Sequence, residues 1–531
     1  MSKQSILVAD SISPKGIEEL QADSAFEVEV NTSITAEELV ASAEKYHAII
    51  VRSRTQITEE VLEKASNLRV VGRAGVGVDN IKIDAASKNG VVVMNTPAGN
   101  TISTAEHAFT LMLSMARHIP HAHESMKAGR WDRKKYQGTE VYDKTLAILG
   151  MGRIGTEFAR RAMAFGMRVV AYDPYLSSSR ARLLRVELVD TVEEAVKDAD
   201  FITLHMPMTP DTKHILNAKR IANLKPGVHI VNCARGGLLD EAAIAKAIDD
   251  GIVAGIALDV YETEPPTEDF VLRESPNAVL TPHLGASTTE AQENVGIEIA
   301  RTVAAHLKEG TVVNAVNMPN IDEKTVAAIG RYLDFAEKLG VLVSQIAPGR
   351  PNTLRVDYSG KVSDVDTTLI TRSALKGYLQ SSCEPGAVNT INAPGFAETQ
   401  GIRVTESHSP NPTEFTDLIE VAVKTDNGEA RVFGTFFGSS PRIVKIGEHR
   451  VEAAPSGTLL VLTNEDTPGR IGQVGCLLGE HKVNIGSMSL SRNTVGELAM
   501  TVFNLDSTPC DDVLRKLEDV PGVTEARVVQ L

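Results

Sequence analysis

The sequence predicts an α/β protein with two doubly wound lobes, followed by an α+β domain and a small ferredoxin-like domain. Short apolar runs alternate with helical stretches over the first three hundred residues, which is typical of parallel sheets covered on both faces. After about residue 316 this pattern gives way to the alternation of apolar and polar residues that is typical of strands. The last segment is predicted to have the element order βαββαβ. At 531 residues the chain is long enough for three or four domains.

The first lobe is predicted from the apolar runs SILVAD, HAIIVRS, LRVVGRAG and GVVVMNT, with a helix near residues 15–21. The long segment STAEHAFTLMLSMAR follows, and its apolar residues recur at helical spacing. Ser103 and Glu106 stand at the S-x-x-E spacing of a capping box, which predicts a helix start at this point. We expect this helix to link the two lobes.

The second lobe is predicted from the runs LAILG, RVVAYD, FITLH, VHIVNCA, GIALDV and AVLTPH, after which a helix is expected over about residues 288–308. Strands of this kind separated by helices indicate Rossmann-like or flavodoxin-like doubly wound topology in both lobes. Beyond residue 316, TLRVDYSG, LIEVAVKT and RVFGTFFG read as strands, and Pro455-Ser456-Gly457 reads as a linker.

Composition excludes several classes of protein. Apolar residues make up 42% of the chain, enough to build several ordinary cores, which excludes disorder and collagen-like repeats. Lys and Arg number 54 against 69 Asp and Glu, and the net charge of −15 argues against nucleic acid or anionic lipid as a partner. The four cysteines lie far apart, so neither a disulfide framework nor a zinc site is expected, and a reducing cytoplasm fits best. No segment has the length of a membrane span.

A nucleotide-binding fingerprint stands directly after the run LAIL. Gly150, Gly152 and Gly155 form G-x-G-x-x-G between this strand and a helical stretch, where they allow a tight turn, close approach of a pyrophosphate and helix packing. The next strand ends in Asp173, a carboxylate that suits ribose hydroxyls and repels a 2′-phosphate, so NAD is favoured over NADP. Glycines that serve packing alone are the alternative.

Three polar residues follow later strands: Arg235 in NCARGG, Glu264 in DVYETEPP and His283 in TPHLGAST. In the oxidation of a 2-hydroxy acid, an imidazole can take the hydroxyl proton, a carboxylate can raise the pKa of that imidazole, and a guanidinium can hold the substrate carboxylate. Taken singly, each is more often a surface, loop or capping residue. Their order after the fingerprint favours catalysis.

This order of motifs resembles the D-isomer-specific 2-hydroxyacid dehydrogenase family over about the first 315 residues. The resemblance implies a substrate-binding domain in two segments, 1–98 and 283–316, with the NAD-binding domain, 99–282, inserted between them. Residues 317–453 resemble the intervening domain of the longest such dehydrogenases, a domain similar to an allosteric substrate-binding domain. Residues 454–531 resemble an ACT regulatory domain.

The resemblance also assigns site residues. Catalysis falls to Arg235, Glu264 and His283, while Arg52, Ser53, Arg73 and Asn100 are implied to meet a phosphorylated substrate, with Arg133, Lys134 and Lys135 added from a neighbouring subunit. For Arg52 and Arg73 the alternative is simple solvation at a strand end. Cofactor contacts are implied for Val76, Gly150, Gly152, Arg153, Ile154, Gly155, Asp173, Met206, Pro207, Cys233, Ala234, Arg235, Asp259, His283, Gly285 and Ala286.

In similar dehydrogenases the ACT domain binds L-serine, and the matching positions here are Asn464, Asp466 and Asn484. Their alternative role is in turns and caps, which suits Asp and Asn equally well. The resemblance further implies a homo-oligomer, expected to be a tetramer.

The function implied is NAD-dependent oxidation of a phosphorylated D-2-hydroxy acid in amino-acid biosynthesis. Alternatives are another 2-hydroxy acid, such as glycerate or 2-hydroxyglutarate, and a non-enzymatic NAD-binding corepressor. His118, His121 and His123 form H-x-x-H-x-H, but Pro120 interrupts the helix and no acid or cysteine completes a ligand set, so no metal is expected.

Overall fold

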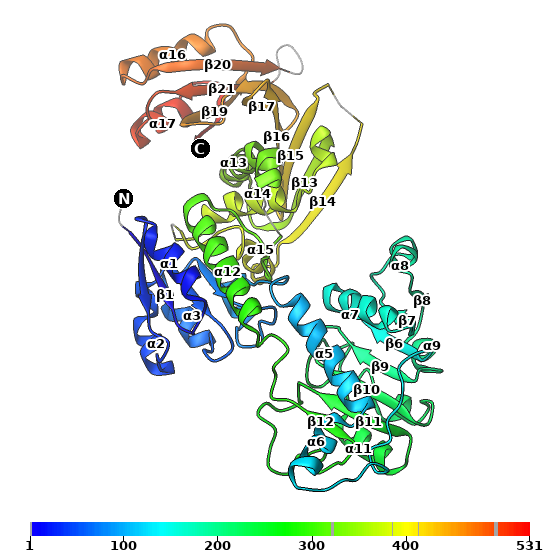
Figure 1. Ribbon diagram of the computed structural model, residues 1–531. Coiled ribbons are helices and arrows are strands. Elements are labelled where there is room, and N and C mark those ends of the chain that lie inside the picture. The colour runs from blue at the N-terminus through cyan, green and yellow to red at the C-terminus, as the bar shows by residue number, and fades with distance from the viewer. Residues whose placement is uncertain (1–2, 320–322, 385, 412–413, 493–497) are drawn as a thin grey trace.

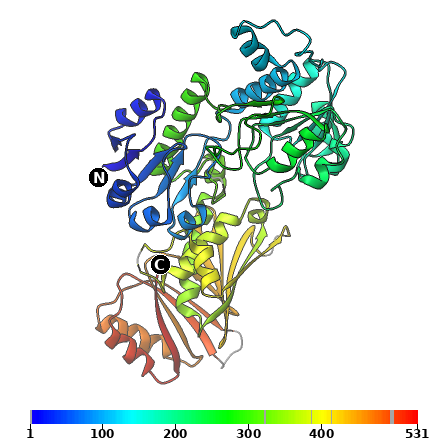
Figure 2. The same cartoon turned by 90° about the horizontal axis from the view of Figure 1, so that it is seen from below.

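The computed structural model describes residues 3–319, 323–384, 386–411, 414–492 and 498–531. Four sheets follow one another along the chain, and the second lobe projects away from the other three (Figure 1). A view at right angles shows the same separation (Figure 2). Among the described residues, no helix is both long and apolar enough to cross a membrane.

The first lobe is a five-stranded parallel sheet in the order β2-β1-β3-β4-β5, the flavodoxin-like arrangement. Helices α1 and α12 cover one face, while α2, α3 and α4 cover the other. The elements are β1 (Gln4–Val8), α1 (Pro14–Ala22), β2 (Phe26–Val30), α2 (Ala36–Ser42), η1 (Ala43–Lys45), β3 (Ala48–Val51), α3 (Glu59–Lys64), β4 (Val70–Arg73), α4 (Ile83–Lys88), β5 (Val92–Met94) and, returning from the second lobe, α12 (Thr289–Glu309).

The helix that leaves the first lobe, α5 (Thr101–Ala116), starts earlier than predicted, and the capping-box prediction was wrong. Asn100 occupies the N-cap without a side-chain cap bond. Ser103 Oγ instead donates to the carbonyl of Asn100, and Glu106 pairs with Arg161 on a neighbouring helix. Because the helix begins at Thr101, Ser103 lies within its first turn and cannot serve as the N-cap that a capping box needs.

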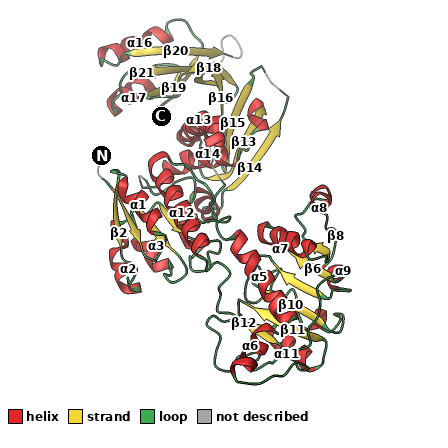
Figure 3. Cartoon of the chain, in the orientation of Figure 1, coloured by secondary structure: helices red, strands yellow, loops and turns green. Residues whose placement is uncertain are grey.

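The second lobe is a seven-stranded parallel sheet in the order β12-β11-β10-β9-β6-β7-β8, so the strand order reverses between β6 and β9. Helices α5 and α7 pack on one face and α9 and α11 on the other, as Figure 3 also shows. The elements are α6 (Ile119–Lys127), β6 (Thr145–Leu149), α7 (Arg153–Ala164), β7 (Arg168–Tyr172), α8 (Ser178–Leu184), β8 (Glu187–Val189), α9 (Val192–Val196), β9 (Phe201–Leu204), α10 (Ala218–Ile221), β10 (Val228–Asn232), α11 (Glu241–Asp249), β11 (Val253–Leu258) and β12 (Ala278–Leu280).

The third sheet has six strands in the order β14-β13-β15-β16-β17-β18; only the β13–β14 pair is parallel. Two helices, α13 and α14, cover one face. The elements are α13 (Glu323–Ile346), β13 (Pro351–Gly360), η2 (Lys361–Asp364), α14 (Thr368–Gln380), α15 (Ala393–Thr399), β14 (Arg403–Ser409), β15 (Asp417–Thr425), β16 (Gly428–Phe437), β17 (Ser440–Ile446) and β18 (His449–Ala453).

The last domain has the predicted βαββαβ order, with its antiparallel sheet arranged β20-β21-β19-β22. Helices α16 and α17 cover one face, and the apolar cluster on the other face is continuous with the core around α13. The elements are β19 (Thr458–Glu465), α16 (Arg470–Glu480), β20 (Ile485–Arg492), β21 (Leu498–Leu505), α17 (Asp511–Glu518) and β22 (Val523–Gln530). The fold class predicted from the sequence is confirmed throughout.

Candidate active site

A cavity of about 250 Å³ opens at the carboxyl ends of the strands of the second lobe, beside the reversal of strand order. This is the edge at which doubly wound sheets bind ligands. The cavity brings together eleven of the residues predicted to contact the cofactor, along with Asn100 and two residues that were not predicted. Its lining is Val76, Asn100, Thr104, Ile154, His205, Met206, Pro207, Cys233, Ala234, Arg235, Asp259, His283, Gly285 and Ala286.

The glycine fingerprint forms the turn between β6 and α7. Gly150 has φ +100°, and a Cβ there would lie 2.5 Å from the carbonyl oxygen of His205. Gly152 faces open space, because nothing lies within 4 Å of the position its Cβ would take. Gly152 is also the N-cap of α7 and supplies no side chain, so the first N–H groups of this helix are left for an anion.

Asp173 follows β7 and lies beside the fingerprint turn. Its Oδ2 accepts a hydrogen bond from the Met151 N–H at 2.7 Å, and its Oδ1 accepts one from the Tyr175 N–H at 2.8 Å. The carboxylate is thus held next to the turn that would carry a pyrophosphate, which is where a ribose-binding acid is needed.

His283 and Glu264 form a hydrogen-bonded pair at the mouth of the cavity. His283 Nδ1 lies 2.7 Å from Glu264 Oε2, while Glu264 Oε1 accepts from the Tyr261 N–H at 3.1 Å. The bond to Glu264 raises the pKa of His283, although burial opposes the rise. Burial alone would raise the pKa of Glu264, but the bond and charge of His283 outweigh it and the pKa falls. Nε2 of His283 is left to act on a substrate.

Arg235 reaches across to the first lobe. Its Nη1 donates to the carbonyl oxygen of Ala234 at 2.7 Å, and its Nε lies 3.4 Å from Asp79 Oδ2. Arg73 faces the same region, and its buried Nε has no hydrogen-bond partner among the described residues. Burial, followed by the charges of Arg235 and Arg52, lowers the pKa of Arg73 to about 10, against the opposing pull of Asp79. Such a set of cations favours an anionic ligand.

The remaining predicted substrate residues lie nearby. Arg52 follows β3, and its N–H donates to Asp10 Oδ2 at 2.6 Å; burial lowers the pKa of its guanidinium. Ser53 is exposed beside it. Asn100 lines the cavity, and its buried Oδ1 has no partner among the described residues.

Three residues of this region were missed by the sequence reasoning. Thr104 and His107 lie one turn apart on α5 and bond to the segment that carries His283. His205 lines the cavity, and its Nδ1 has no hydrogen-bond partner in the part of the chain that the structure describes. Burial lowers the pKa of His205 to about 3, so its imidazole is neutral. The i, i+3 spacing of Thr104 and His107 was visible in the sequence, but nothing there showed what this helix face would meet.

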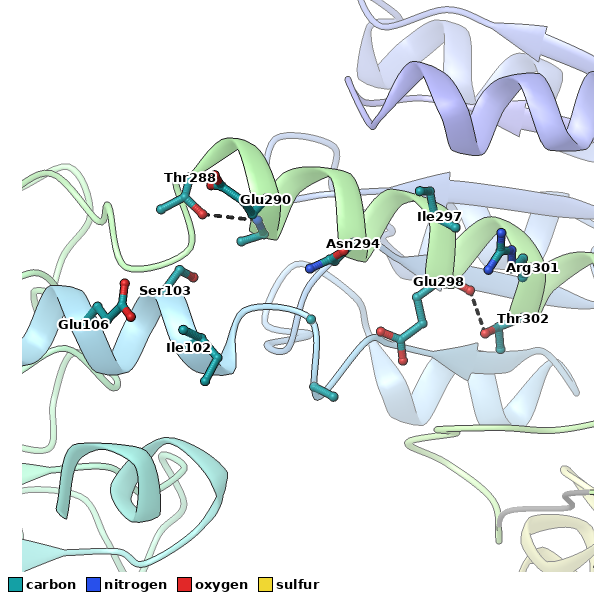
Figure 4. Close-up of a pocket in the computed structure, with 13 residues that line it drawn as sticks. Ile102, Ser103, Glu106, Thr288, Glu290, Asn294, Ile297, Glu298, Arg301 and Thr302 are labelled. Atoms are coloured by element: carbon teal, nitrogen blue, oxygen red, sulfur yellow. Dashed lines mark hydrogen bonds between the residues drawn. The ribbon is translucent and has the colours of Figure 1, made fainter. Parts of the chain in front are cut away.

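A second, larger cavity of about 790 Å³ lies between the first turns of α5 and the helix α12 (Figure 4). Ile102, Ser103 and Glu106 line it from α5, and Asn294 and Glu298 line it from α12. None of the predicted catalytic, cofactor or substrate residues lines this cavity. This cavity therefore lies at the junction of the two lobes and is separate from the candidate active site.

The three predicted effector residues are not brought together within one chain. Asn464 is buried near the end of β19, and Asp466 pairs with Arg492 at 2.9 Å. Asn484 precedes β20, whose first residue is level with the start of β19, and it donates to Asp506 Oδ2 at 2.6 Å. Six residues of strand, about 20 Å, separate Asn464 from that level.

The three predicted histidines lie around the start of α6. His118 is the N-cap of this helix, and Pro120 lies in its first turn, followed by His121 and His123. The part of the chain that the structure describes contains no group of three or more His, Cys, Asp or Glu side chains arranged to hold a metal ion.

Fold and site together define a class of protein. Residues 109–285 match the NAD binding domain of the D-isomer specific 2-hydroxyacid dehydrogenases, and the fingerprint and the His283–Glu264 pair lie within this match. The chain is therefore an NAD-dependent oxidoreductase. Residues 328–447 match the D-3-phosphoglycerate dehydrogenase intervening domain, and residues 458–522 match the ACT domain.

Full-length relatives identify the family. The chain is 41% identical over 526 residues to a D-3-phosphoglycerate dehydrogenase of Methanocaldococcus jannaschii, covering 99% of each chain. It is 40% identical over 530 residues to the enzyme of Bacillus subtilis, again covering 99% of each. A solved NAD⁺-bound 3-phosphoglycerate dehydrogenase of Entamoeba histolytica matches 60% of this chain and 99% of its own, with 28% identity and a TM-score of 0.51. The chain belongs to the D-3-phosphoglycerate dehydrogenase family.

Proposed function

We propose that this chain oxidises D-3-phosphoglycerate to 3-phosphohydroxypyruvate with NAD, the first step of phosphorylated L-serine biosynthesis. The observation that carries the proposal is that a carboxylate-supported imidazole lies in the same region as a set of arginines, of which Arg235 lines the cavity and Arg73 has a buried Nε without a hydrogen-bond partner among the described residues. The imidazole suits removal of a hydroxyl proton, and the arginines suit a substrate with both a carboxylate and a phosphate.

The residues divide the chemistry between them. Arg235 holds the substrate carboxylate, and Arg52, Arg73, Ser53 and Asn100 hold the phosphorylated end. Nε2 of His283 takes the hydroxyl proton, while Glu264 keeps the ring oriented and stabilises its charged form. Bound NAD supplies a hydride acceptor at the nicotinamide, and the fingerprint turn and Asp173 hold its pyrophosphate and ribose.

The experiment that tests this function is an initial-rate assay of NADH formation with D-3-phosphoglycerate, with D-glycerate and D-2-hydroxyglutarate in parallel and product removed. A higher kcat/KM for the phosphorylated acid supports the proposal. A preference for an unphosphorylated acid assigns the chain to another 2-hydroxyacid dehydrogenase. If the protein binds NADH but turns over none of these acids, the result favours the alternative of a non-enzymatic NAD-binding corepressor.

We also propose the domain boundaries 1–98 with 283–316, 99–282, 317–453 and 454–531. Packing of α12 on α1 and on the first sheet supports the two-segment substrate domain. Limited proteolysis with mass spectrometry tests the boundaries, since cleavage should concentrate at these junctions.

L-serine is the proposed effector of the ACT domain, acting in a homotetramer. Because Asn464 and Asn484 lie far apart in one chain, a site that uses both requires two chains. Trp131 and Tyr142 are exposed aromatic residues of the second lobe, which suits contact with another copy, and Arg133, Lys134 and Lys135 lie in the same segment as Trp131. Light scattering with and without L-serine, together with an inhibition titration, tests both points.

All four cysteines are free, which supports a cytoplasmic location.

A further inference from the structure

Asp259 is a buried carboxylate at the centre of the segment that carries His283. It follows β11, and its side chain is 1% exposed. Oδ1 accepts from Thr281 Oγ1 at 2.6 Å and from the Leu284 N–H at 2.7 Å, and Oδ2 accepts from the Gly285 N–H at 2.8 Å. The bonds thus fall on both sides of His283 in the chain.

His283 needs such anchoring, because its backbone lies in the left-handed region with φ +56°. A residue with a Cβ adopts this conformation only where the surroundings hold it. In this backbone conformation the ring of His283 meets Glu264, so the flanking bonds at residues 281, 284 and 285 help to set the geometry of the catalytic pair.

Helix α5 contacts the same segment from the other side. Nε2 of His107 lies 3.1 Å from Asp259 Oδ1 and 3.2 Å from Thr281 Oγ1, and Thr104 Oγ1 donates to the Gly285 carbonyl oxygen at 3.1 Å. Burial opposes ionisation of Asp259, but the bonds from His107, Thr281, Leu284 and Gly285 together outweigh it and lower the pKa of Asp259. An ionised carboxylate only accepts hydrogen bonds, so the hydrogen of this contact is on His107 Nε2.

We propose that His107 is a positioning residue for catalysis: with Thr104, it fixes Asp259 and Thr281 and so holds the His283 segment on the second lobe. The inference rests on the proposed function for its reaction, but not for its geometry. Its particular consequence is that the two segments that connect the lobes, α5 and residues 283–288, are linked to each other beside the cavity by these hydrogen bonds. His283 therefore moves with the second lobe when the lobes close over a substrate.

The test compares His107→Leu, which removes the donor, with His107→Gln, whose amide N–H can still donate to Asp259. Loss of one partner of a buried carboxylate is expected to lower the kcat of His107→Leu about tenfold or more. The Kd for NADH, measured by fluorescence, should change less than about threefold, and His107→Gln should recover most of the kcat. His123→Leu, an exposed histidine on α6, is the matched control and should behave as the unchanged enzyme.

A His107→Leu enzyme with unchanged kcat overturns the inference. So do equal losses in the Leu and Gln variants accompanied by an equal fall in melting temperature, since these indicate packing alone. If His107→Leu does not fold, Thr104→Val decides: a lowered kcat at an unchanged Kd for NADH supports the inference, and an unchanged kcat overturns it. If the unchanged enzyme binds NADH but prefers another 2-hydroxy acid, the proposed function fails separately, and the variants are compared on that acid.

Discussion

Arg73 and Arg235 come from different lobes and lie close enough for their charges to repel one another. Arg73 ends β4 of the first lobe, whereas Arg235 follows β10 of the second. The charge of Arg235 is the second cause, after burial, of the lowered pKa of Arg73. An anion bound between them would relieve this repulsion, so the substrate itself is expected to draw the lobes together.

Removal of Arg73 should therefore weaken binding of the phosphorylated substrate. Arg73→Ala is expected to raise the KM for D-3-phosphoglycerate about tenfold or more, because a charge-assisted hydrogen bond is worth roughly 1.5–3 kcal/mol. The kcat/KM for D-glycerate should change far less. Arg73→Lys keeps the charge but not the planar guanidinium, so its KM for D-3-phosphoglycerate should lie between those of the wild-type enzyme and Arg73→Ala. Equal losses on both acids would show that Arg73 does not recognise phosphate.

Removal of the imidazole should abolish most turnover. His283→Ala is expected to lower kcat by about 10²–10⁴-fold, the usual contribution of general acid–base catalysis, and to leave NADH binding measurable by fluorescence. Activity close to that of the unchanged enzyme would mean that another group takes the proton.

The charge of Glu264 should set the pH dependence of the reaction. Glu264 raises the pKa of His283, and oxidation requires the neutral imidazole, so kcat/KM rises with pH as His283 loses its proton. In Glu264→Gln the pKa of His283 falls, and the acidic limb of the profile should move to lower pH while the plateau rate drops. Glu268→Gln, at an exposed neighbouring acid, should leave the profile unchanged. A limb that stays in place, or moves to higher pH, would contradict the pairing.

Asp173 should decide the choice of cofactor. Asp173→Ala is expected to raise the KM for NAD and to lower the ratio of kcat/KM for NAD to that for NADP, because the carboxylate that repels a 2′-phosphate is gone. Initial rates with both cofactors measure this ratio. An unchanged ratio would place cofactor selection elsewhere.

Close packing of α1 on α12 should be sensitive to a single methyl group. A Cβ at Gly296 in α12 would lie 2.7 Å from both the N and Cβ atoms of Ser13, so Gly296→Ala is expected to destabilise the fold by about 1–3 kcal/mol. Gly472→Ala, also within a helix but with nothing near the added Cβ, should be neutral or slightly stabilising. Denaturant unfolding of the two variants, compared with the unchanged protein, measures the difference.

Much of the fold was predictable because its signals are local. The fingerprint glycines, Asp173 and the apolar runs before Arg235 and His283 each depend on a few neighbouring residues, and the doubly wound topology brings strand ends to one edge. The start of α5 was not predictable in this way, since its N-cap Asn100 makes no side-chain cap bond and so leaves no local capping signal. The parallel pairing of β13 with β14 likewise depends on a crossover through α14 and α15.

The candidate site shows the same limit. Asp259 was predicted from the resemblance as a cofactor contact, and that role stays a prediction. Its bonds to His107, Leu284 and Gly285 join three segments that are distant in sequence, so no single motif contains them. The separation of Asn464 from Asn484 was not predictable either. The two residues are only twenty positions apart in the sequence, and this spacing does not show which end of the sheet each one occupies.

The long apolar cluster of the first lobe does not stop at that lobe. It runs from β1 and β3 through α12 and α13 to Leu459, Val461 and Val529 in the last sheet, whereas the second lobe has its own clusters. The first lobe and the last two domains thus share one continuous core, and the second lobe is attached to them as a separate unit. A ligand that tilts or stiffens the last domain is therefore expected to change the position of the first lobe relative to the second, because the continuous cluster transmits the displacement.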